Sequence, residues 1–281
     1  MLSLAVATDA ETLDRIRGPL ADRGISASYV NYRKRTLLLP DSPFSPGDFD
    51  VGLVYPGRLM EGGVLDAFID VPWVNDRDAV LRSRNKAGVL ARLETAGVSV
   101  PETVFVSNPT DDDAVLDALA GFDYPVVVKP NSATRGVGVT KLGDADSALG
   151  VTDYLDLIHE FPATDDTSYL VQEYVSDATD YRVMVLDGEY VGAVERRGTG
   201  WKHNVHRGAD ATGTDPPDRV KTAAENAAAV LDIPLLGVDV LDTGARTVVN
   251  ETNARPTIDA ETKYEDGFYD RLAELVRVTR R

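Results

Sequence analysis

Cysteine is absent from this sequence of 281 residues, which excludes disulfide bonds, thiolate metal sites and a cysteine nucleophile. Histidine is rare, so a catalytic zinc site with three histidine ligands would need all of His159, His203 and His206. No apolar run approaches the roughly 20 residues that span a bilayer, and the first residues lack the pattern of a signal peptide. We therefore expect a cytoplasmic protein without a membrane span.

Lysine is scarce and acid is abundant. The chain has 7 lysines and 22 arginines against 33 aspartates and 13 glutamates, and its formal net charge is −17. Nucleic-acid backbones attract basic surfaces, so general nucleic-acid binding is disfavoured. The acid is spread along the chain, which favours a dispersed acidic surface over an acidic tail.

Hydrophobic residues make up 43% of the chain, enough for a folded core. Short apolar runs at 2–8, 25–32 and 51–56 alternate with helical segments in the first part, which is typical of a parallel sheet with covering helices. Residues 78–97 are predicted to form one helix that ends at Gly97.

The rest of the chain reads as further strands, hairpins and helices. Expected strands lie at 124–130, in 131–142 after a turn, and at 169–175; expected hairpins at 181–198 and 234–253; and expected helices at 147–160, 216–231 and 266–280.

Lys129 ends the buried strand VVVK and is followed by the glycine-containing stretch SATRGVG. A lysine and backbone N–H groups of a flexible turn can surround a phosphate. The order of a Walker A loop is missing. A hairpin whose glycines only satisfy turn geometry is the alternative.

Three oxygen-bearing side chains lie on one predicted hairpin. Glu251 and Asn253 share a face of their strand, and the facing strand can bring Asp239 to the same side. Two carboxylates and an amide oxygen suit Mg2+ held together with nucleotide phosphates. The alternative is a solvated strand face in an aspartate-rich protein.

Two weaker signals remain. Basic residues gather at Arg196–Arg197 and at 202–207, which suggests an anion site, although a zinc site from His203 and His206 or a plain surface loop would give the same pattern. The strand end at 172–175 can offer backbone groups to an adenine edge, and Asp180 can accept ribose hydroxyls.

In this order the motifs resemble the ATP-grasp superfamily, and most of all its RimK-like group of amino-acid ligases. The segments that carry the resemblance are RNKAGVLARLETAG, VVVKP with SATRGVG, QEYV, ERR, NVHRG, GVD and ETN. The resemblance implies an α/β fold of the α+β ATP-grasp type. A parallel-sheet pre-ATP-grasp domain (1–95) would precede a central (96–175) and a C-terminal (176–281) ATP-grasp subdomain that clasp nucleotide.

The resemblance also implies site residues. ATP would be bound by Lys86, Lys129, Ser132, Gly136, Gly138, Glu173, Val175 and Asp180. Mg2+, or Mn2+ in its place, would be bound by Asp239, Glu251 and Asn253. Catalytic groups near the transferred phosphate would be Arg197, Asn204 and Arg207.

The implied activity is an ATP- and Mg2+-dependent carboxylate–amine ligase that forms an amide through an acyl phosphate. It would attach glutamate or another amino acid to a small molecule, a carrier protein or a peptide. A coenzyme-tailoring glutamate ligase, a non-catalytic ATP-binding module and an ATP-grasp kinase are the alternatives, and a homo-oligomer would fit the group.

One segment departs from RimK itself. Arg255-Pro256-Thr257 stands where RimK looks more like Ser-Pro-Gly. Arg255 would bind an acceptor carboxylate or form a structural ion pair, so the departure puts a ribosomal-protein substrate in doubt.

The acidic, lysine-poor composition generates the first testable prediction. Such surfaces suit high salt, where screening shortens charge repulsion to a few ångströms, and we hypothesise a salt-accumulating source organism. Far-ultraviolet circular dichroism is expected to show loss of folded structure in dilute buffer and its recovery at molar salt. Full stability and activity at low ionic strength would contradict this hypothesis.

Overall fold

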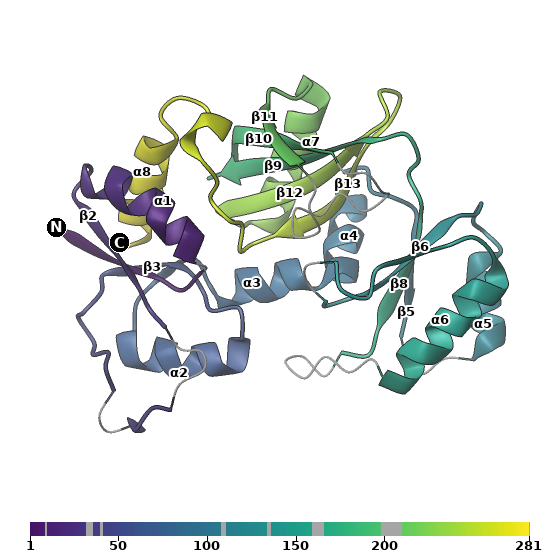
Figure 1. Ribbon diagram of the computed structural model, residues 1–281, viewed down its shortest axis with the longest axis horizontal. Helices are drawn as coiled ribbons and strands as arrows, with labels where there is room; N and C mark the ends of the chain where they lie inside the picture. The colour runs from purple at the N-terminus through teal and green to yellow at the C-terminus, as the bar shows by residue number, and fades with distance from the viewer. Residues whose placement is uncertain are drawn as a thin grey trace.

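The computed structural model describes residues 1–8, 10–31, 36–39, 42–107, 111–133, 136–158, 166–197 and 210–280. Within these residues the chain forms three sheets in succession (Figure 1). Their strands come from residues 2–75, 103–173 and 179–253. The boundaries of the three domains stay a prediction.

The first sheet is parallel and has the strand order β2-β1-β3-β4. Its strands are β1 (Leu2–Val6), β2 (Ile25–Tyr29), β3 (Val51–Val54) and β4 (Trp73–Asn75). The helices α1 (Ala10–Ala21) and α2 (Leu59–Ile69) make the crossovers. The predicted parallel sheet is confirmed. The sequence did not reveal β4, because three residues after a proline are too few for a periodic pattern.

The predicted single helix over 78–97 is wrong. The structure has two helices, α3 (Arg77–Arg84) and α4 (Lys86–Thr95), separated at Asn85. The Asn85 side chain accepts a hydrogen bond from the Gly88 N–H at 2.9 Å and thereby begins a new helix. The break gives α4 its own direction and makes Lys86 its first residue, with only 7% of that side chain exposed.

The second sheet is antiparallel with the order β5-β8-β6-β7. Its strands are β5 (Thr103–Val106), β6 (Val126–Pro130), β7 (Thr140–Leu142) and β8 (Tyr169–Glu173). The helices α5 (Asp112–Leu119) and α6 (Ala145–Ile158) lie beside it (Figure 1). The acidic run 111–113 lies at the N-terminus of α5. Negative carboxylates are stabilised there by the positive end of the helix dipole.

The third sheet is antiparallel with the order β11-β10-β9-β12-β13. Its strands are β9 (Thr179–Leu186), β10 (Glu189–Arg197), β11 (Asp210–Thr214), β12 (Leu235–Asp242) and β13 (Thr247–Asn253). Both hairpins predicted from the sequence, β9–β10 and β12–β13, are confirmed. The helix α7 (Asp218–Leu231) packs against this sheet. The 3-10 helix η3 (Glu261–Lys263) comes after β13 in the sequence.

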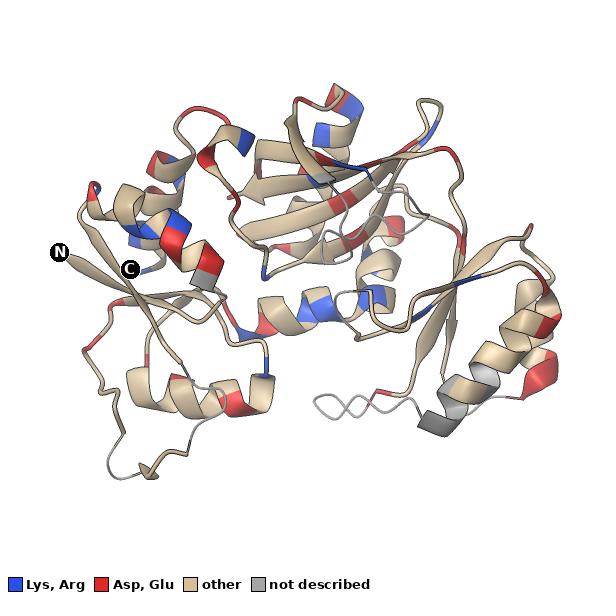
Figure 2. Ribbon diagram, viewed as in Figure 1, with Lys and Arg blue, Asp and Glu red and all other residues tan. Residues whose placement is uncertain are grey.

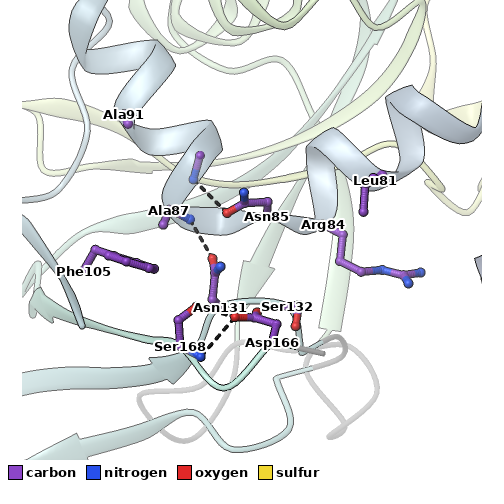
Figure 3. A pocket seen from close by; sticks show the side chains of 11 residues that line it. Leu81, Arg84, Asn85, Ala87, Ala91, Phe105, Asn131, Ser132, Asp166 and Ser168 are labelled. Atoms are coloured by element: carbon purple, nitrogen blue, oxygen red, sulfur yellow. Dashed lines mark hydrogen bonds between the residues drawn. The ribbon is translucent and has the colours of Figure 1, made fainter. Parts of the chain in front are cut away.

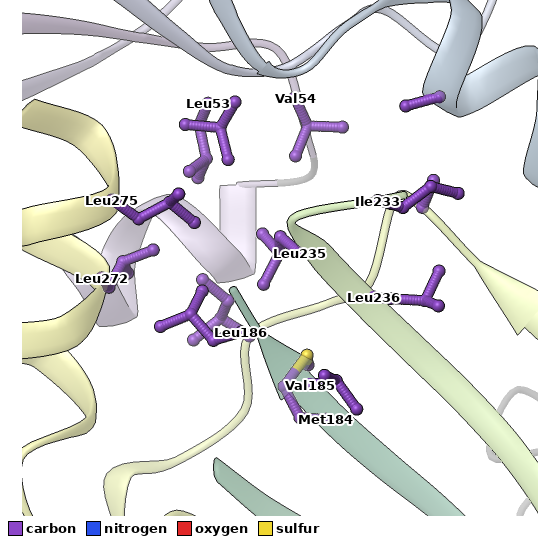
Figure 4. Packing of buried hydrophobic residues seen from close by; sticks show 14 of the residues in the cluster. Leu53, Val54, Met184, Val185, Leu186, Ile233, Leu235, Leu236, Leu272 and Leu275 are labelled. Atoms are coloured by element: carbon purple, nitrogen blue, oxygen red, sulfur yellow. The ribbon is translucent and has the colours of Figure 1, made fainter. Parts of the chain in front are cut away.

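The last helix returns to the first sheet. α8 (Phe268–Thr279) packs on α1, β3 and β4, so the two ends of the chain lie close together (Figure 1). Leu53 of β3, Leu272 of α8, and Leu186 and Leu235 of the third sheet belong to one buried cluster (Figure 4). The helix-covered face of the second sheet has a separate core around Val126, Val128 and Val171, which are almost completely buried. The first and third sheets are therefore fixed to each other by a continuous hydrophobic core.

Positions of Asp and Glu are scattered along the ribbon from the first sheet to the last helix and do not gather in one part of it (Figure 2). This distribution agrees with the dispersed acid expected from the sequence. Among the described residues, no helix combines the length and the apolar character needed to cross a membrane.

Asn75 connects the first sheet to the third through buried backbone groups. The residue is completely buried. Its side-chain NH2 group donates to the carbonyls of Leu235 and Ala254 at 2.6 Å each, and its side-chain oxygen accepts from the Leu235 N–H at 3.1 Å. Buried backbone groups need such partners, because an unpaired one costs about 1–3 kcal/mol.

The substitution Asn75→Ala is expected to lower the free energy of unfolding by about 3 kcal/mol, since three buried backbone groups lose their partner. Chemical denaturation would measure it. The control is Asn226→Ala at an exposed position of α7, which should change stability by less than about 0.5 kcal/mol. Equal effects of the two substitutions would contradict the assignment.

Candidate functional site

Two buried lysines from different elements converge on β13. Lys86 donates from its Nζ to the carbonyl of Ala133 and lies 3.2 Å from Oε1 of Glu251. Lys129, at the end of β6, donates to Oε1 of Gln172 at 2.8 Å and to Oδ1 of Asn250 at 3.4 Å. The break before α4 and the end of β6 thus bring both ammonium groups to neighbouring residues of one strand.

Burial shifts the protonation of Lys129. Lys129 is only 4% exposed. Desolvation lowers the pKa of its ammonium from 10.5 to about 8. Glu251 and Asp239 oppose this shift, whereas the positive charge of Lys86 adds to it. Lys129 is therefore charged below about pH 8.

The three predicted metal ligands lie on one hairpin, as the sequence indicated. Asp239 of β12 stands opposite Glu251 of β13, and Gly237 stands opposite Asn253. A register shift after Asp239 distorts the ladder at this point. Oδ1 of Asn253 accepts a hydrogen bond from the Arg255 N–H at 2.9 Å.

Asp239 is held by two arginines. Arg182 of β9 donates to both of its carboxylate oxygens, at 2.7 and 2.8 Å, and Arg196 of β10 approaches one of them at 3.1 Å. Burial alone would raise the pKa of Asp239, but the two guanidinium groups outweigh it and lower that pKa to about 2. Asp239 is thus an anion at neutral pH.

Arg182 is a site residue that sequence reasoning missed. Residues 180 and 182 share a face of β9, which alternation along a strand predicts. Arg182 also pairs with Asp239 across the strands. Recognising it needed the register between β9 and β12, which one sequence does not supply.

The donor set fits a hard divalent cation. Asp239 and Glu251 supply carboxylate oxygens, and Asn253 supplies an amide oxygen. A carboxylate has about four lone-pair positions, so the arginines on Asp239 leave room for a metal ion. The described residues contain no cluster of three or more histidine, aspartate or glutamate side chains that could hold a metal ion. The mixed set of two carboxylates and one amide stays a predicted metal site.

Glu173 connects the predicted adenine hinge to two other parts of the chain. The carboxylate of Glu173 accepts from the Glu102 N–H at 2.8 Å and pairs with Arg246 at 2.7 Å. The Glu173 N–H donates to the Glu102 carbonyl at 2.9 Å. Val175 follows β8 and is half-buried. The hinge is thereby attached to the hairpin that carries the metal candidates, through Arg246.

Asp180, predicted to accept ribose hydroxyls, lies in β9 with 7% exposure and pairs with Arg196 at 2.6 Å. Its carboxylate therefore belongs to the same charge network as Asp239. A role toward ribose stays a prediction.

The other predicted residues are placed unevenly. Ser132 is buried, and Gly136 and Gly138 have positive φ angles of 66° and 76° that favour glycine. A Cβ atom at Gly138 would lie 2.7 Å from Cγ of Pro130. Arg197 is 80% exposed and pairs with Glu195. Asn204 and Arg207 lie outside the described residues, as do all three histidines.

Arg255 contacts the first sheet. Its guanidinium donates to the carbonyls of Tyr55 and Ala7, just beyond the ends of β3 and β1. This geometry shows a structural contact of Arg255 with backbone carbonyls. A role toward an acceptor carboxylate stays a prediction.

A pocket of about 640 Å3 lies beside the phosphate-loop candidate (Figure 3). Ala87 and Ala91 of α4, Phe105 of β5, and Asn131 and Ser132 after β6 are among its lining residues. Ser132, one of the predicted ATP-binding residues, lines this pocket, whereas Lys86 and Lys129 are not among its lining residues. The pocket therefore lies beside the two lysines.

Solved structures share this fold over the whole chain. D-cycloserine synthetase DcsG superposes with a TM-score of 0.73 at 20% identity, covering 99% of this chain and 100% of that one. D-alanine–D-alanine ligase from Bacillus anthracis, complexed with ATP, gives 0.70 at 16% identity and covers 100% and 97%. An ATP-grasp RimK domain protein from Sphaerobacter thermophilus gives 0.68 at 23%, covering 99% and 98%. The fold is the ATP-grasp fold, as the sequence led us to expect.

Sequence comparison places the chain more closely. A family model described as the RimK-like ATP-grasp domain matches residues 83–268. The chain belongs to the RimK-like ATP-grasp family. The resemblance inferred from the order of motifs is thereby confirmed, whereas the comparisons do not bear out the salt-accumulating origin, which stays a hypothesis.

Two curated relatives illustrate the level of similarity. A probable alpha-L-glutamate ligase from Halorhodospira halophila is 30% identical over 190 residues, which are 66% of this chain and 60% of the relative. A ribosomal protein bS6–L-glutamate ligase from Shigella boydii is 30% identical over 194 residues, covering 68% and 62%. The chain thus spans about three fifths of the length of these relatives.

The burial of Lys129 can be tested without any activity. Nuclear magnetic resonance of lysine-labelled protein is expected to give this ammonium a midpoint at about pH 8, because its charge is desolvated. Lys221, which bonds to Asp215 on the surface, should titrate above its usual 10.5. Lys129→Arg assigns the signal. A midpoint for Lys129 at or above that of Lys221 would contradict the burial.

Proposed function

We propose that this protein is an ATP- and Mg2+-dependent carboxylate–amine ligase that attaches glutamate, or another amino acid, to an acceptor. Membership of the RimK-like family supports the class of reaction. The names of the relatives, alpha-L-glutamate ligase and ribosomal protein bS6–L-glutamate ligase, support glutamate as the amino acid. Cytoplasmic location remains part of this proposal.

One observation carries the proposal. The ammonium groups of Lys86 and Lys129 converge on the hairpin that holds Asp239, Glu251 and Asn253. Cations and hard oxygen donors in one place are what Mg2+ and a triphosphate require together. Phosphoryl transfer depends on positioning and charge neutralisation more than on a protein nucleophile.

The proposed reaction has two steps. The substrate carboxylate attacks the γ-phosphorus of ATP, and ADP leaves with the electron pair of the broken bond. The amine of the second substrate then attacks the acyl carbon, inorganic phosphate leaves, the amine loses a proton, and an amide remains.

The side chains of the cluster have distinct parts in this reaction. Lys86 and Lys129 would bind phosphate oxygens, and Arg182 with Arg196 would hold Asp239 ionised. Mg2+, when bound by Asp239, Glu251 and Asn253, would neutralise charge on the phosphates. The segment 132–138 would exclude water from the acyl phosphate.

The acceptor is proposed at the level of class. The bS6-directed relatives favour a protein or peptide acceptor. Arg255 donates to backbone carbonyls of the first sheet at the residue where the sequence departs from RimK. Because this segment differs from that of RimK, the activity test includes small acids as acceptors beside proteins and peptides.

ADP release is expected only when ATP, Mg2+, an acid and an amine are all present, and mass spectrometry should find an amide. Lys129→Ala and Glu251→Ala should lower turnover by about 1000-fold or more, because each removes charge from the phosphate site. Lys221→Ala at a half-buried position of α7 and Glu274→Ala at an exposed position of α8 serve as controls and should keep turnover.

Three results would overturn the proposal. Undiminished turnover in Lys129→Ala or Glu251→Ala would refute the assigned roles. A phosphate ester in place of an amide would identify a kinase. ATP binding with no product for any acid and amine pair would identify a nucleotide-binding module.

A further inference from the structure

A chain of three hydrogen bonds runs across the second sheet and ends on Lys129. The hydroxyl of Thr103 donates to the carbonyl of Pro101 at 2.8 Å. The amide nitrogen of Gln172 donates to Oγ1 of Thr103 at 2.8 Å. The Lys129 ammonium then donates to Oε1 of Gln172 at 2.8 Å.

The strand register aligns these three side chains. Thr103 of β5 pairs with Gln172 of β8, and Lys129 of β6 pairs with Leu170 of β8, two residues before Gln172. Because side chains alternate along a strand, the three groups lie on one face of neighbouring strands. Gln172 is 3% exposed and Lys129 4%, so water has little access to replace either partner.

This series of hydrogen bonds can form in one direction only. A hydroxyl has a single proton, and that of Thr103 is used on Pro101, so toward Gln172 it can only accept. Gln172 must therefore turn its NH2 group to Thr103 and its carbonyl oxygen to Lys129. The flipped amide would place NH2 against an ammonium that has no acceptor to offer, and the oxygen of Thr103 would face another oxygen.

Lys129 has three N–H groups, and the described residues accept two of them, at Gln172 and at Asn250. The bonds to Gln172 and Asn250 together set the direction of the remaining N–H. A fixed ammonium loses less conformational entropy when a phosphate oxygen binds to it.

We propose that Gln172 and Thr103 are positioning residues, which act through Lys129 by holding its ammonium oriented toward the nucleotide phosphates. This inference rests on the proposed function, because it takes Lys129 as a phosphate ligand. In this role neither side chain needs to touch ATP, because each acts through its bond to the next group. Thr103 acts at two removes, by orienting the amide of Gln172.

Four variants test the chain by calorimetric titration with ATP and Mg2+. Gln172→Met keeps the length of the side chain without its acceptor, and Thr103→Val keeps the shape without the hydroxyl. Gln172→Met is expected to weaken ATP binding about tenfold, which matches the loss of one hydrogen bond to a charged group. Thr103→Val removes the neutral bond that orients Gln172 and is expected to weaken binding by about fivefold. Thr103→Ser restores the hydroxyl and should return affinity to within about twofold. The control Thr212→Val alters an exposed strand position and should bind as the parent chain does.

A second measurement needs no nucleotide. The charged groups that face Lys129 are Lys86 from α4, Glu251 from β13 and Asp239 from β12, and all of them remain in the variants. In Gln172→Met the midpoint of the Lys129 ammonium should fall by about one pH unit, since the charged form loses an acceptor. Turnover at saturating ATP should change less than the KM for ATP.

The outcomes separate the inference from the proposed function. Unchanged ATP affinity in both Gln172→Met and Thr103→Val, or a Thr103→Ser variant as weak as Thr103→Val, overturns the inference. ATP binding that follows the expected order without amide formation supports the inference and refutes the ligase. In a chain that binds no ATP, an unmoved Lys129 midpoint overturns the inference.

Discussion

Buried charge is the constraint on which the rest of this structure depends. A buried ammonium or carboxylate without a partner costs several kcal/mol, so each must meet an opposite charge or a dipole. Lys86 comes from α4, Lys129 from β6, Asp239 from β12 and Glu251 from β13. Asp239 meets Arg182 and Arg196 within the third sheet, whereas Lys86 and Lys129 meet Glu251 and Asn250 only where α4 and the second sheet approach β13. The complete cluster therefore depends on how these parts of the fold come together.

The hydrophobic core is arranged around this requirement. The first and third sheets share one core with α8, whereas the helix-covered face of the second sheet has its own. Polar contacts join the second sheet to the remainder beside the charged cluster, as between Ala87 and Asn131 and between Arg246 and Glu173. Such contacts exchange with water or ligand at a smaller cost than apolar packing.

The sequence was sufficient wherever local chemistry decides the outcome. It predicted the parallel sheet, both hairpins and the approach of Asp239 to Glu251, because alternation and turn residues determine these features. It failed at one local helix cap inside a periodic pattern and at one pairing that depends on strand register. Asn85 divides one periodic helix into two, and Arg182 reaches Asp239 through a register that only the folded sheet defines. The roles of Asn204 and Arg207 stay predictions.

The choice between lysine and arginine within the cluster has a physical meaning. Arg182 binds both oxygens of Asp239 in a planar fork and stays charged at any pH the protein meets. Lys129 is a point charge whose pKa burial lowers to about 8. Arginine thus suits the permanent task of keeping the acid ionised. Lysine, with three rotatable donors, suits a phosphate that arrives and leaves, provided that neighbours such as Gln172 keep its ammonium charged and directed. In a chain with seven lysines, two of them at this junction mark it more clearly than the net charge of −17 does.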